Sequence, residues 1–359
     1  MKIAIGMSGG VDSSLAAVLL TEQGHEVTGI SMSIWDGKEQ RGKRRRHSCF
    51  GPEEKANIET AKEICRLIGI PFYVIDCSKN FSDTVIEYFK NEYMSARTPN
   101  PCIVCNQRIK FDALLSNARA SGLSFEKFAT GHYARIERDS GTERYLLKRA
   151  IDKKKDQSYF LYRLSQDQLS GVMFPLGGLT KEEVRAKARE KSIPVSEKEE
   201  SQDFLGGNYR ELLNIPGTEG DIVLTDGRVL GRHSGLWNYT PGQRRGLGIA
   251  YPEPLYVLRL DARINTVIVG TRSDIKVNSF IVNKLNWISF KKPATTFPAS
   301  VKIRSSQREF KCNVEILNDI EAKVTLERAN EAISPGQSAV FYSGDILLGG
   351  GIIDRECAD

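Results

Sequence analysis

The sequence predicts an open parallel α/β sheet in the first half of the chain, followed by two smaller β-rich parts. Strand-like and helix-like segments alternate up to about residue 136, glycine-rich turns dominate from about 207, and short alternating strands recur beyond about 275. Strands at such regular spacing are typical of a small barrel or sandwich. We therefore predict domains at 1–206, 207–275 and 276–359.

The elements of the first half follow from hydrophobic periodicity and from helix stop signals. We expect, in order, a strand at 2–7, a helix at 13–24, a strand at 25–32, a helix at 52–69, a strand at 70–76, helices at 83–96 and 108–122, and a strand at 127–136. Gly24 is a suitable stop for the first helix, and Ser82 is a suitable cap for the helix at 83–96.

The composition of the chain limits the classes of protein to which it can belong. With 359 residues, 40% hydrophobic and 27% charged, the chain is globular and long enough for two or three domains. No apolar run approaches a membrane span, and the first ten residues lack the pattern of a signal peptide. We therefore expect a cytoplasmic protein without a membrane partner, whose seven cysteines are more suited to metal or redox chemistry than to structural disulfides. The net charge of +6 permits a nucleic-acid partner without requiring one.

The segment "GMSGGVDSS" at 6–14 joins the first expected strand to the first helix. Two glycines allow a sharp bend with exposed N–H groups, serines add hydroxyl donors, and the helix N-terminus adds partial positive charge. The segment lacks the lysine of the P-loop nucleoside triphosphatases. Asp12 would repel phosphate unless it holds Mg²⁺ or backbone N–H groups. The alternative is a plain glycine-rich turn, but the string is specific enough to favour a phosphate-binding loop.

The segment resembles the PP-loop ATP pyrophosphatases, which adenylate a carbonyl oxygen and release pyrophosphate. Further strings resemble one branch, the tRNA-specific 2-thiouridylase (MnmA) family. They are "TPNPCIVCNQRIKF" (98–111), "TGHYARI" (130–136), "KDQSYFLYRL" (155–164), "ESQDF" (200–204) and "TPGQRRGLGI" (240–249). The resemblance covers essentially the whole chain. It implies an adenine nucleotide alpha-hydrolase-like sheet domain, a small central β-rich domain and a C-terminal β-barrel.

The resemblance also implies a reaction and its residues. ATP adenylates the 2-oxygen of the wobble uridine in tRNA, a cysteine-borne sulfur attacks carbon 2, and AMP leaves; the sulfur comes from a donor protein or a sulfide source. The residues implied to contact ATP are Gly6, Met7, Ser8, Gly9, Gly10, Val11, Asp12, Ser13, Met32 and Gly131. Those implied to approach tRNA are Asn100, Pro101, Cys102, Lys155, Asp156, Gln157, Arg304 and Ser305. Asp12, Cys102 and Cys105 are the predicted catalytic residues.

Two basic segments have a physical interpretation beside this resemblance. "KKKDQSYF" at 153–160 interleaves lysines with aromatic residues, which suits phosphate contact and base stacking, but alone it would indicate a solvated charge run. The "GKRRRH" run at 42–47 is either a solvated loop or an arm that contacts the tRNA backbone. His132 is expected to be a core or hydrogen-bonding residue beside the nucleotide.

The cysteines depart from the family pattern. Cys105 falls on the family's catalytic cysteine, whereas Cys102 falls where many members carry aspartate. Leu205 occupies the position of a second catalytic cysteine, and leucine cannot carry a persulfide. The usual relay between two cysteines cannot run on those positions.

The Cys102-x-x-Cys105 pair offers a replacement, and two routes stay open. Pro99 and Pro101 hold the segment extended, and a helix expected to start near Asn106 would lower the pKa of both thiols. In one route a persulfide forms and the second thiol resolves it. In the other, Cys102, Cys105 and Cys49 hold a [4Fe–4S] cluster with one open iron.

The other cysteines are assigned by periodicity. Cys65 and Cys312 lie on expected core faces, Cys357 lies in the tail, and Cys77 is ambiguous. Two rival functions remain: a PP-loop adenylating ligase or amidotransferase without sulfur chemistry, and a catalytically silent tRNA-binding protein.

Overall fold

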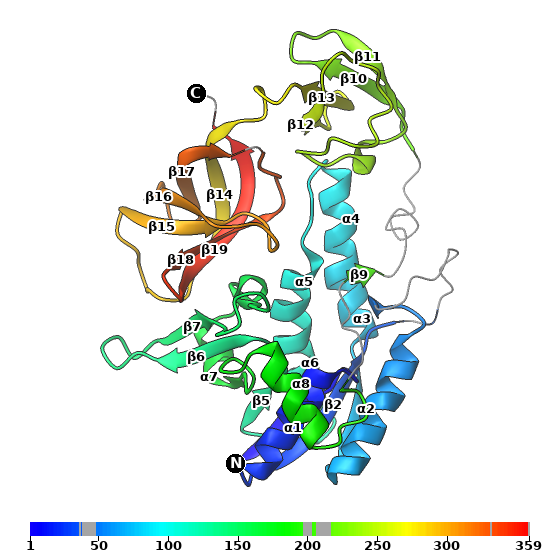
Figure 1. Cartoon of the computed structure of the whole chain (residues 1–359), viewed down its shortest axis with the longest axis vertical. Coiled ribbons are helices and arrows are strands. Elements are labelled where there is room, and N and C mark those ends of the chain that lie inside the picture. The colour runs from blue at the N-terminus through cyan, green and yellow to red at the C-terminus, as the bar shows by residue number, and fades with distance from the viewer. Residues whose placement is uncertain (36, 38–47, 197–202, 206–216, 331, 358–359) are drawn as a thin grey trace. The chain divides into compact units, whose positions relative to one another are not determined.

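The computed structural model describes residues 1–35, 37, 48–196, 203–205, 217–330 and 332–357 (Figure 1). The chain forms two compact units. Unit 1 comprises Met1–Ile86, Pro101–Leu213 and Asp345–Leu347; unit 2 comprises Glu87–Asn100, Asn214–Gly344 and Leu348–Asp359. Within the described ranges, no helix is both long enough and apolar enough to span a membrane.

Unit 1 is built on the predicted parallel sheet. Its five strands have the order β4 (Phe72–Asp76), β2 (Glu26–Ser33), β1 (Lys2–Gly6), β5 (Lys127–Ala129) and β8 (Val172–Met173). Every neighbouring pair in this order is parallel. The sequence prediction of an open parallel sheet is therefore confirmed.

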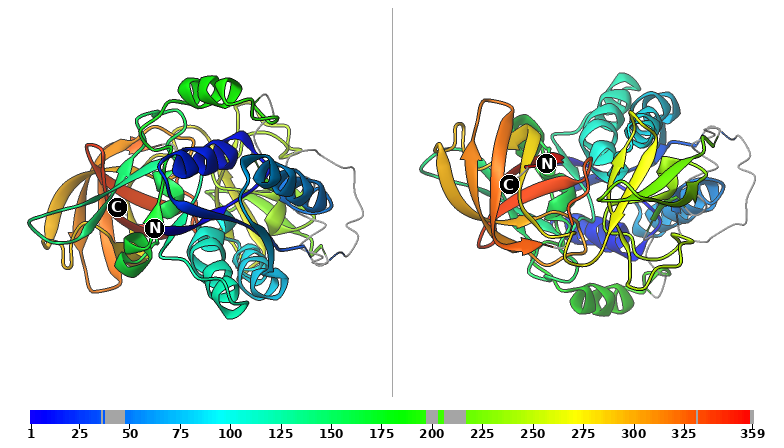
Figure 2. Two further views of the ribbon diagram at one scale, coloured as in Figure 1. Left: turned by 90° about the horizontal axis from the view of Figure 1, so that it is seen from below. Right: turned by 90° about the horizontal axis from the view of Figure 1, so that it is seen from above.

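Helices cover both faces of this sheet. The chain moves from β1 through α1 (Val11–Glu22) to β2 and through α2 (Glu54–Ile68) to β4, so right-handed crossovers place both helices on one face. It then returns to the other side of β1, and the helical segment that ends in α6 (Leu114–Ala120) covers the opposite face (Figure 2). The core under α1 and α2 is aliphatic and includes Ile3, Ile5, Leu15, Ala16, Leu20, Val27, Ala61 and Ile64.

The helix expected at 83–96 begins earlier than predicted. Helical structure starts with α3 (Ser78–Phe81) and continues through η1 (Ser82–Ile86) into α4 (Glu87–Met94). The Asp76 carboxylate accepts the backbone N–H of Ser78 at 2.8 Å and so satisfies a donor of the first turn. Ser82 is therefore not a helix cap, and that prediction was wrong.

The cysteine-bearing helix also begins earlier than predicted. It starts at Pro101 and runs without a break through α5 (Pro101–Val104), η2 (Cys105–Ala113) and α6. Proline suits the first helical position because its fixed φ is helical and that position needs no N–H donor. The expected start near Asn106 was wrong. The η2 segment is a π-helix, a form often found at functional sites.

The strand expected at 127–136 is two strands in different sheets. β5 ends at Ala129, and β6 (Ala134–Arg138) pairs antiparallel with β7 (Tyr145–Arg149). Within unit 1, Ile346 and Leu347 extend this hairpin by pairing with β7. Residues 130–133 are thus a loop at the end of the parallel sheet rather than part of a strand.

The remaining elements of unit 1 were not predicted. They are the short parallel pair β3 (Ser48–Phe50) and β9 (Asp203–Leu205), η3 (Ser158–Leu161), α7 (Gln166–Ser170) and α8 (Lys181–Glu190). Ser165 and Thr180 close capping boxes at α7 and α8.

Unit 2 holds two β structures. A four-stranded sheet has the order β11 (Val229–His233), β10 (Gly220–Leu224), β13 (Thr266–Gly270) and β12 (Tyr256–Asp261), with η4 (Leu236–Asn238) beside it. The C-terminal strands are β14 (Val277–Trp287), β15 (Thr296–Lys302), β16 (Phe310–Ile316), β17 (Glu321–Asn330), β18 (Ser338–Ser343) and β19 (Ile346–Glu356).

The C-terminal strands close into a barrel because β14 pairs with both β17 and β19. The three-part fold class is confirmed, while the boundaries at 206 and 275 stay predictions.

Candidate functional site

The site lies where the strand order of the parallel sheet reverses. From β1 the chain crosses first toward β2 and later toward β5, so the loops after β1 and β5 meet at the same edge of the sheet. Open α/β sheets bind ligands at such a point, outside the carboxyl ends of the strands. These two loops line a pocket of about 330 Å³.

The loop after β1 is held rigidly by its own serines. Ser8 donates its N–H to the Ser13 hydroxyl at 3.2 Å, and the hydroxyls of Ser13 and Ser14 donate to the Gly10 carbonyl at 3.1 and 2.8 Å. Gly9 has a φ of +71°, and a Cβ there would lie 2.5 Å from the Asn57 carbonyl oxygen. The loop therefore requires glycine at this position, and it leads directly into the N-terminus of α1.

The loop after β5 packs directly against the first turn of α1. A Cβ on Gly131 would lie 2.8 Å from both the Asp12 carbonyl carbon and the Ser13 nitrogen. Only glycine permits this approach. Gly131, predicted as an ATP contact, therefore lies beside the phosphate-binding loop.

Asp12 is held by two residues that the sequence analysis missed. The Tyr133 hydroxyl donates to Asp12 Oδ1 at 2.6 Å, and Lys181 Nζ lies 2.7 and 2.9 Å from the two carboxylate oxygens. Lys181 is only 8% exposed, and the Thr180 capping box fixes it as the first residue of α8. The lysine neutralises the carboxylate, so Asp12 acts here as a loop anchor. The capping-box pattern at Thr180 was the sequence signal that could have located Lys181 on a helix.

Most of the predicted ATP contacts share the pocket. Its lining includes Gly6, Met7, Ser8, Gly10, Val11, Asp12, Ser13, Met32 and Gly131. Lining residues that the sequence analysis did not assign to ATP are Ile30, Ser31, Ile34, Cys49, Glu54, Asn57, Ile58, Lys110, Leu114, Phe128, Thr130, His132 and Gln157.

Glu54 brings a second carboxylate to the pocket wall. It accepts the Ser33 hydroxyl at 2.9 Å and the N–H groups of Ile34 and Trp35 at 3.0 and 3.1 Å. Burial raises its pKa, and these hydrogen bonds act in the opposite direction. Glu54 thereby fixes the end of β2 beside the nucleotide loop.

His132 is a neutral hydrogen-bonding residue of the pocket wall. Its Nδ1 lies 2.7 Å from the Thr130 hydroxyl, and its ring packs against Phe111 and Phe174. Burial lowers the pKa of His132 well below its ordinary value. This agrees with the expected hydrogen-bonding role.

Within the segment 155–157, Asp156 is buried and binds neighbouring residues, whereas Gln157 lines the pocket. The Asp156 side chain is 2% exposed and accepts from Arg149 at 3.3 Å and from the N–H and hydroxyl of Ser158 at 3.1 and 3.0 Å. Its carboxylate is thus turned into the fold. Gln157 accepts the Tyr133 N–H at 2.9 Å and lines the pocket. Lys155 is partly exposed.

The two cysteines of the C-x-x-C pair have different environments. Cys102 is half-buried in the first helical turn, whereas Cys105 is 8% exposed and lies one turn further along. Burial raises the pKa of Cys105 to about 11; Lys110 opposes this rise, and Cys49 and Cys77 add to it. The expectation of a lowered pKa was wrong for Cys105, because burial of the thiol disfavours its charged thiolate form.

The other cysteines fall into two groups. Cys65 and Cys312 are buried as predicted, and Cys77 is buried as well. Cys49 is exposed and lines the pocket.

Among the residues whose structure is described, no three His, Cys, Asp or Glu side chains are arranged to hold a metal ion. The predicted cluster ligands Cys49, Cys102 and Cys105 are therefore not assembled as a metal site.

The remaining predicted tRNA contacts have other surroundings. Asn100 in unit 2 is 9% exposed, and its N–H donates to the Tyr88 hydroxyl at 3.2 Å. Arg304, also in unit 2, donates to the Pro241 carbonyl at 2.9 Å and the Ser334 hydroxyl at 2.7 Å; Ser305 is exposed. Pro101 opens the helix in unit 1. The segments 42–47 and 200–202 lie outside the described residues.

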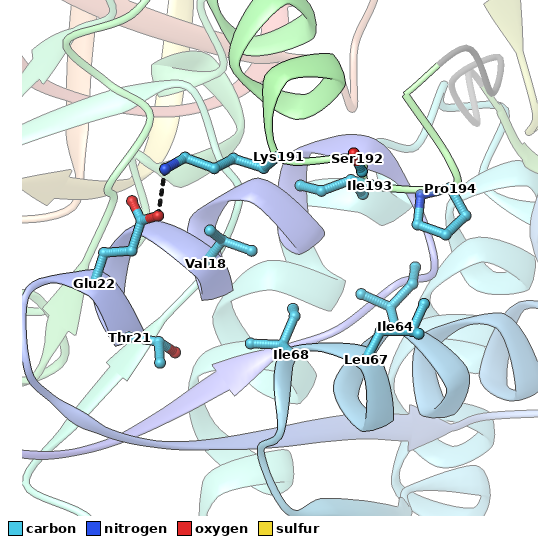
Figure 3. Close-up of a pocket in the computed structure, with 10 residues that line it drawn as sticks. All are labelled: Val18, Thr21, Glu22, Ile64, Leu67, Ile68, Lys191, Ser192, Ile193 and Pro194. Atoms are coloured by element: carbon cyan, nitrogen blue, oxygen red, sulfur yellow. Dashed lines mark hydrogen bonds and ion pairs between the residues drawn. The ribbon is translucent and has the colours of Figure 1, made fainter.

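A second pocket of unit 1, of about 410 Å³, has a different character (Figure 3). Its lining is mainly aliphatic and comes from α1, α2 and the segment that follows α8, with the Lys191–Glu22 ion pair on one side. Neither a glycine-rich loop nor a thiol is among its lining residues. The glycine-serine loop that is predicted to bind phosphate lines the first pocket instead.

Family models for three successive domains agree with this architecture. Family models match as a tRNA methyl transferase HUP domain at residues 1–205, a tRNA methyl transferase PRC-barrel domain at 212–271 and an aminomethyltransferase beta-barrel domain at 277–353. Among solved structures, a 4-thiouridine synthetase–RNA complex with bound ATP aligns at a TM-score of 0.36 and 16% identity, covering 60% of this chain and 46% of that one.

Curated relatives match over nearly their full length. A tRNA-specific 2-thiouridylase MnmA from Endomicrobium trichonymphae is 48% identical over 98% of this chain and 99% of the relative. One from Chloroflexus aggregans is 47% identical over 99% and 98%. With this identity and the matching order of domains, the chain belongs to the tRNA-specific 2-thiouridylase MnmA family.

Proposed function

We propose that the protein catalyses the ATP-dependent 2-thiolation of the wobble uridine of tRNA, a reaction that belongs to the sulfurtransferases. The observation that carries this proposal is the composition of one pocket. The glycine-serine loop lines it together with one thiol, Cys49, and with Lys110, which comes from the helix that bears Cys105; Cys105 itself is not among the lining residues. A nucleotide-activating loop and sulfur chemistry are thus neighbours.

Adenylation explains why such a site needs ATP. The 2-oxygen of uridine belongs to a urea-like carbonyl and is a very poor leaving group until it is esterified to AMP. The backbone N–H groups of the loop and the N-terminus of α1 suit the phosphates of ATP. Lys181 neutralises Asp12, which removes a repulsive charge from beside those phosphates.

Mg²⁺ would accompany ATP in this reaction, with few ligands from the protein. Both carboxylates that line the pocket in the described ranges, Asp12 and Glu54, already accept hydrogen bonds or an ion pair. Mg²⁺ readily keeps several waters and binds through substrate phosphates. The triphosphate and water would therefore supply most of its ligands.

Sulfur transfer would use Cys105, loaded from a persulfide donor protein or another sulfide source. The donor set for an iron–sulfur cluster does not converge in the described part of the chain, so the persulfide route has the better support. We place the reaction in the cytosol, where thiol reductants keep cysteines reduced. Lys155, Gln157, Asn100, Pro101, Cys102, Arg304 and Ser305 are the proposed tRNA contacts.

The test is the dependence of ATP cleavage on tRNA. Purified protein, ATP and Mg²⁺ should release AMP and pyrophosphate only when tRNA with an unmodified wobble uridine is present. A tRNA in which that uridine is replaced by cytidine is the matched control. AMP release that ignores tRNA and responds to small carboxylic acids or amines would support the adenylating ligase instead.

A further inference from the structure

The nucleotide pocket needs a full positive charge that its phosphate loop does not provide. The triphosphate of ATP is strongly anionic, whereas backbone N–H groups and a helix N-terminus offer only partial charges. Asp12 and Lys181 neutralise each other, and Glu54 adds a carboxylate that accepts backbone N–H groups. A cation from another element would therefore complete the site.

Lys110 is the residue that meets this need. It lines the pocket together with Gly6 at the end of β1 and Gly131 in the loop after β5, and it is the only lysine or arginine among the described lining residues. Its side chain is partly exposed, and within the described ranges it forms neither a hydrogen bond nor an ion pair. His132 also lines the pocket, but its lowered pKa keeps it neutral.

The neighbouring residue holds Lys110 at the end of β5. Phe111 is 2% exposed, and the centroid of its ring lies 5.8 Å from the ring centroids of both Phe128 and His132. Both of these rings line the pocket. Lys110 lowers the pKa of His132, which agrees with an ammonium group close to this loop. The backbone at Lys110 is thus fixed beside the nucleotide.

The position of the cysteine indicates which phosphate Lys110 would contact. Cys105 and Lys110 belong to the same π-helix, and five residues, the spacing of its hydrogen bonds, place them about one turn apart. In the proposed function, on which this inference rests, sulfur from Cys105 attacks the carbon whose oxygen is joined to the α-phosphate. The α-phosphate must then lie on the side of the pocket nearest this helix, which covers the face of the sheet opposite α1 (Figure 2).

We propose that Lys110 binds the α-phosphate of ATP and is a catalytic residue of adenylation and of AMP release. In the first step the uridine 2-oxygen bonds to the α-phosphorus, pyrophosphate leaves with the electron pair of the broken P–O bond, and the N3 proton passes to solvent. The ammonium stabilises the charge that develops on the α-phosphate. It then stabilises AMP, which leaves carbon 2 with the electron pair of the C–O bond. Lys110 keeps its proton throughout.

The experiment measures nucleotide affinity without tRNA or Mg²⁺. Full-length wild type, Lys110→Met and Lys110→Arg are titrated with adenosine, AMP and ATP. Lys110→Met should bind AMP and ATP about 10- to 100-fold more weakly, by the same factor for both, because these ligands share the α-phosphate. Adenosine should bind as it does to the wild type, and Lys110→Arg should recover most of the lost affinity.

Arg108→Met is the matched control, since it removes an exposed cation from the same helix. It should bind all three ligands as the wild type does. The ratio of AMP to adenosine affinity is compared within each protein, so a partial loss of structure, which weakens both ligands, is not mistaken for a lost phosphate contact.

The rate of adenylation is the second readout. With tRNA, Mg²⁺ and saturating ATP, Lys110→Met should lower the kcat for AMP formation on the order of 100-fold, because the ammonium acts most strongly on the transition state. A structural role would not produce this loss in a protein that binds adenosine normally.

Three results would overturn the inference. A larger loss for ATP than for AMP would assign Lys110 to the β- or γ-phosphate. An equal loss for adenosine and AMP would show that Lys110 only supports the pocket, and unchanged AMP affinity would show that it makes no phosphate contact. Failure of the proposed function is a separate result, because the wild type would then form no AMP with tRNA while the affinity series without tRNA could still hold.

Discussion

Asp12 illustrates at the residue scale how a carboxylate can lie in a loop suited to phosphate. Its charge is matched by Lys181 at 2.7 Å and its orientation is fixed by the Tyr133 hydroxyl at 2.6 Å. The sequence pattern located Asp12 in the loop, but its partners come from residues 121 and 169 positions away. Local sequence signals do not report such distant contacts.

Lys181→Met should weaken ATP binding and destabilise unit 1. The substitution leaves a partly buried carboxylate without its cation, and we expect a loss of about 1–3 kcal/mol in the free energy of unfolding. The KM for ATP should rise, because Asp12 would then repel the phosphates. Equilibrium denaturation and ATP titration measure the two effects.

The double variant Asp12→Asn/Lys181→Met is the matched control, since it removes both charges. It should recover part of the stability that Lys181→Met loses. If Lys181→Met binds ATP and unfolds as the wild type does, the ion pair has no role.

Cys105 should react slowly with iodoacetamide in the free protein at pH 7. Burial raises its pKa to about 11 from an ordinary value of 9.0, so the thiolate at pH 7 is ~100-fold scarcer than in the unfolded chain. Labelling should rise about tenfold per pH unit between pH 7 and 10, where the thiolate fraction grows with pH. Tandem mass spectrometry separates Cys105 from Cys102. Labelling at pH 7 that is as fast in native as in denatured protein would contradict the burial argument.

The elements of the nucleotide-binding half were predicted unevenly. β1, α1, β2, α2 and β4 follow from local periodicity and glycine stops; Gly24 and Gly69, just beyond the two helices, have φ of +79° and +82°. The division of 127–136 into β5, a loop and β6 was missed because it depends on the contact between Gly131 and the first turn of α1. That contact joins distant segments, and periodicity over ten residues cannot detect it.

Gly131→Ala should disturb nucleotide binding more than folding. Its new Cβ would lie 2.8 Å from the backbone of Asp12 and Ser13, which would displace the phosphate loop at a cost of about 1–3 kcal/mol. We expect a raised KM for ATP with the cooperative unfolding transition retained. Gly178→Ala is the matched control, since a Cβ there has no atom within 4 Å. Equal KM values for the two variants would show that the close approach is not needed.

The whole molecule joins an ATP-binding α/β unit to a β-rich unit whose strands were largely predicted. The alternating segments beyond residue 275 do form the closed barrel. Period-two alternation of buried residues is clear in β16, whereas β18 and β19 are buried almost continuously. The resemblance located the chemistry in 98–111, and the structure places Lys110 of this segment in the nucleotide pocket. The pairing of β3, which carries Cys49, with β9, which carries Leu205, could not be predicted, because the two strands are far apart in the sequence.

The central claim is that ATP activation and sulfur transfer occur on one tRNA nucleotide. Its most direct test is to quantify 2-thiouridine and AMP together, by mass spectrometry of nucleosides from tRNA treated with protein, ATP, Mg²⁺, persulfide and dithiothreitol. The account predicts one 2-thiouridine for each AMP with the wild type, and AMP without 2-thiouridine with Cys105→Ser. Normal 2-thiouridine formation by Cys105→Ser, or AMP formation by the wild type without any 2-thiouridine, would contradict it.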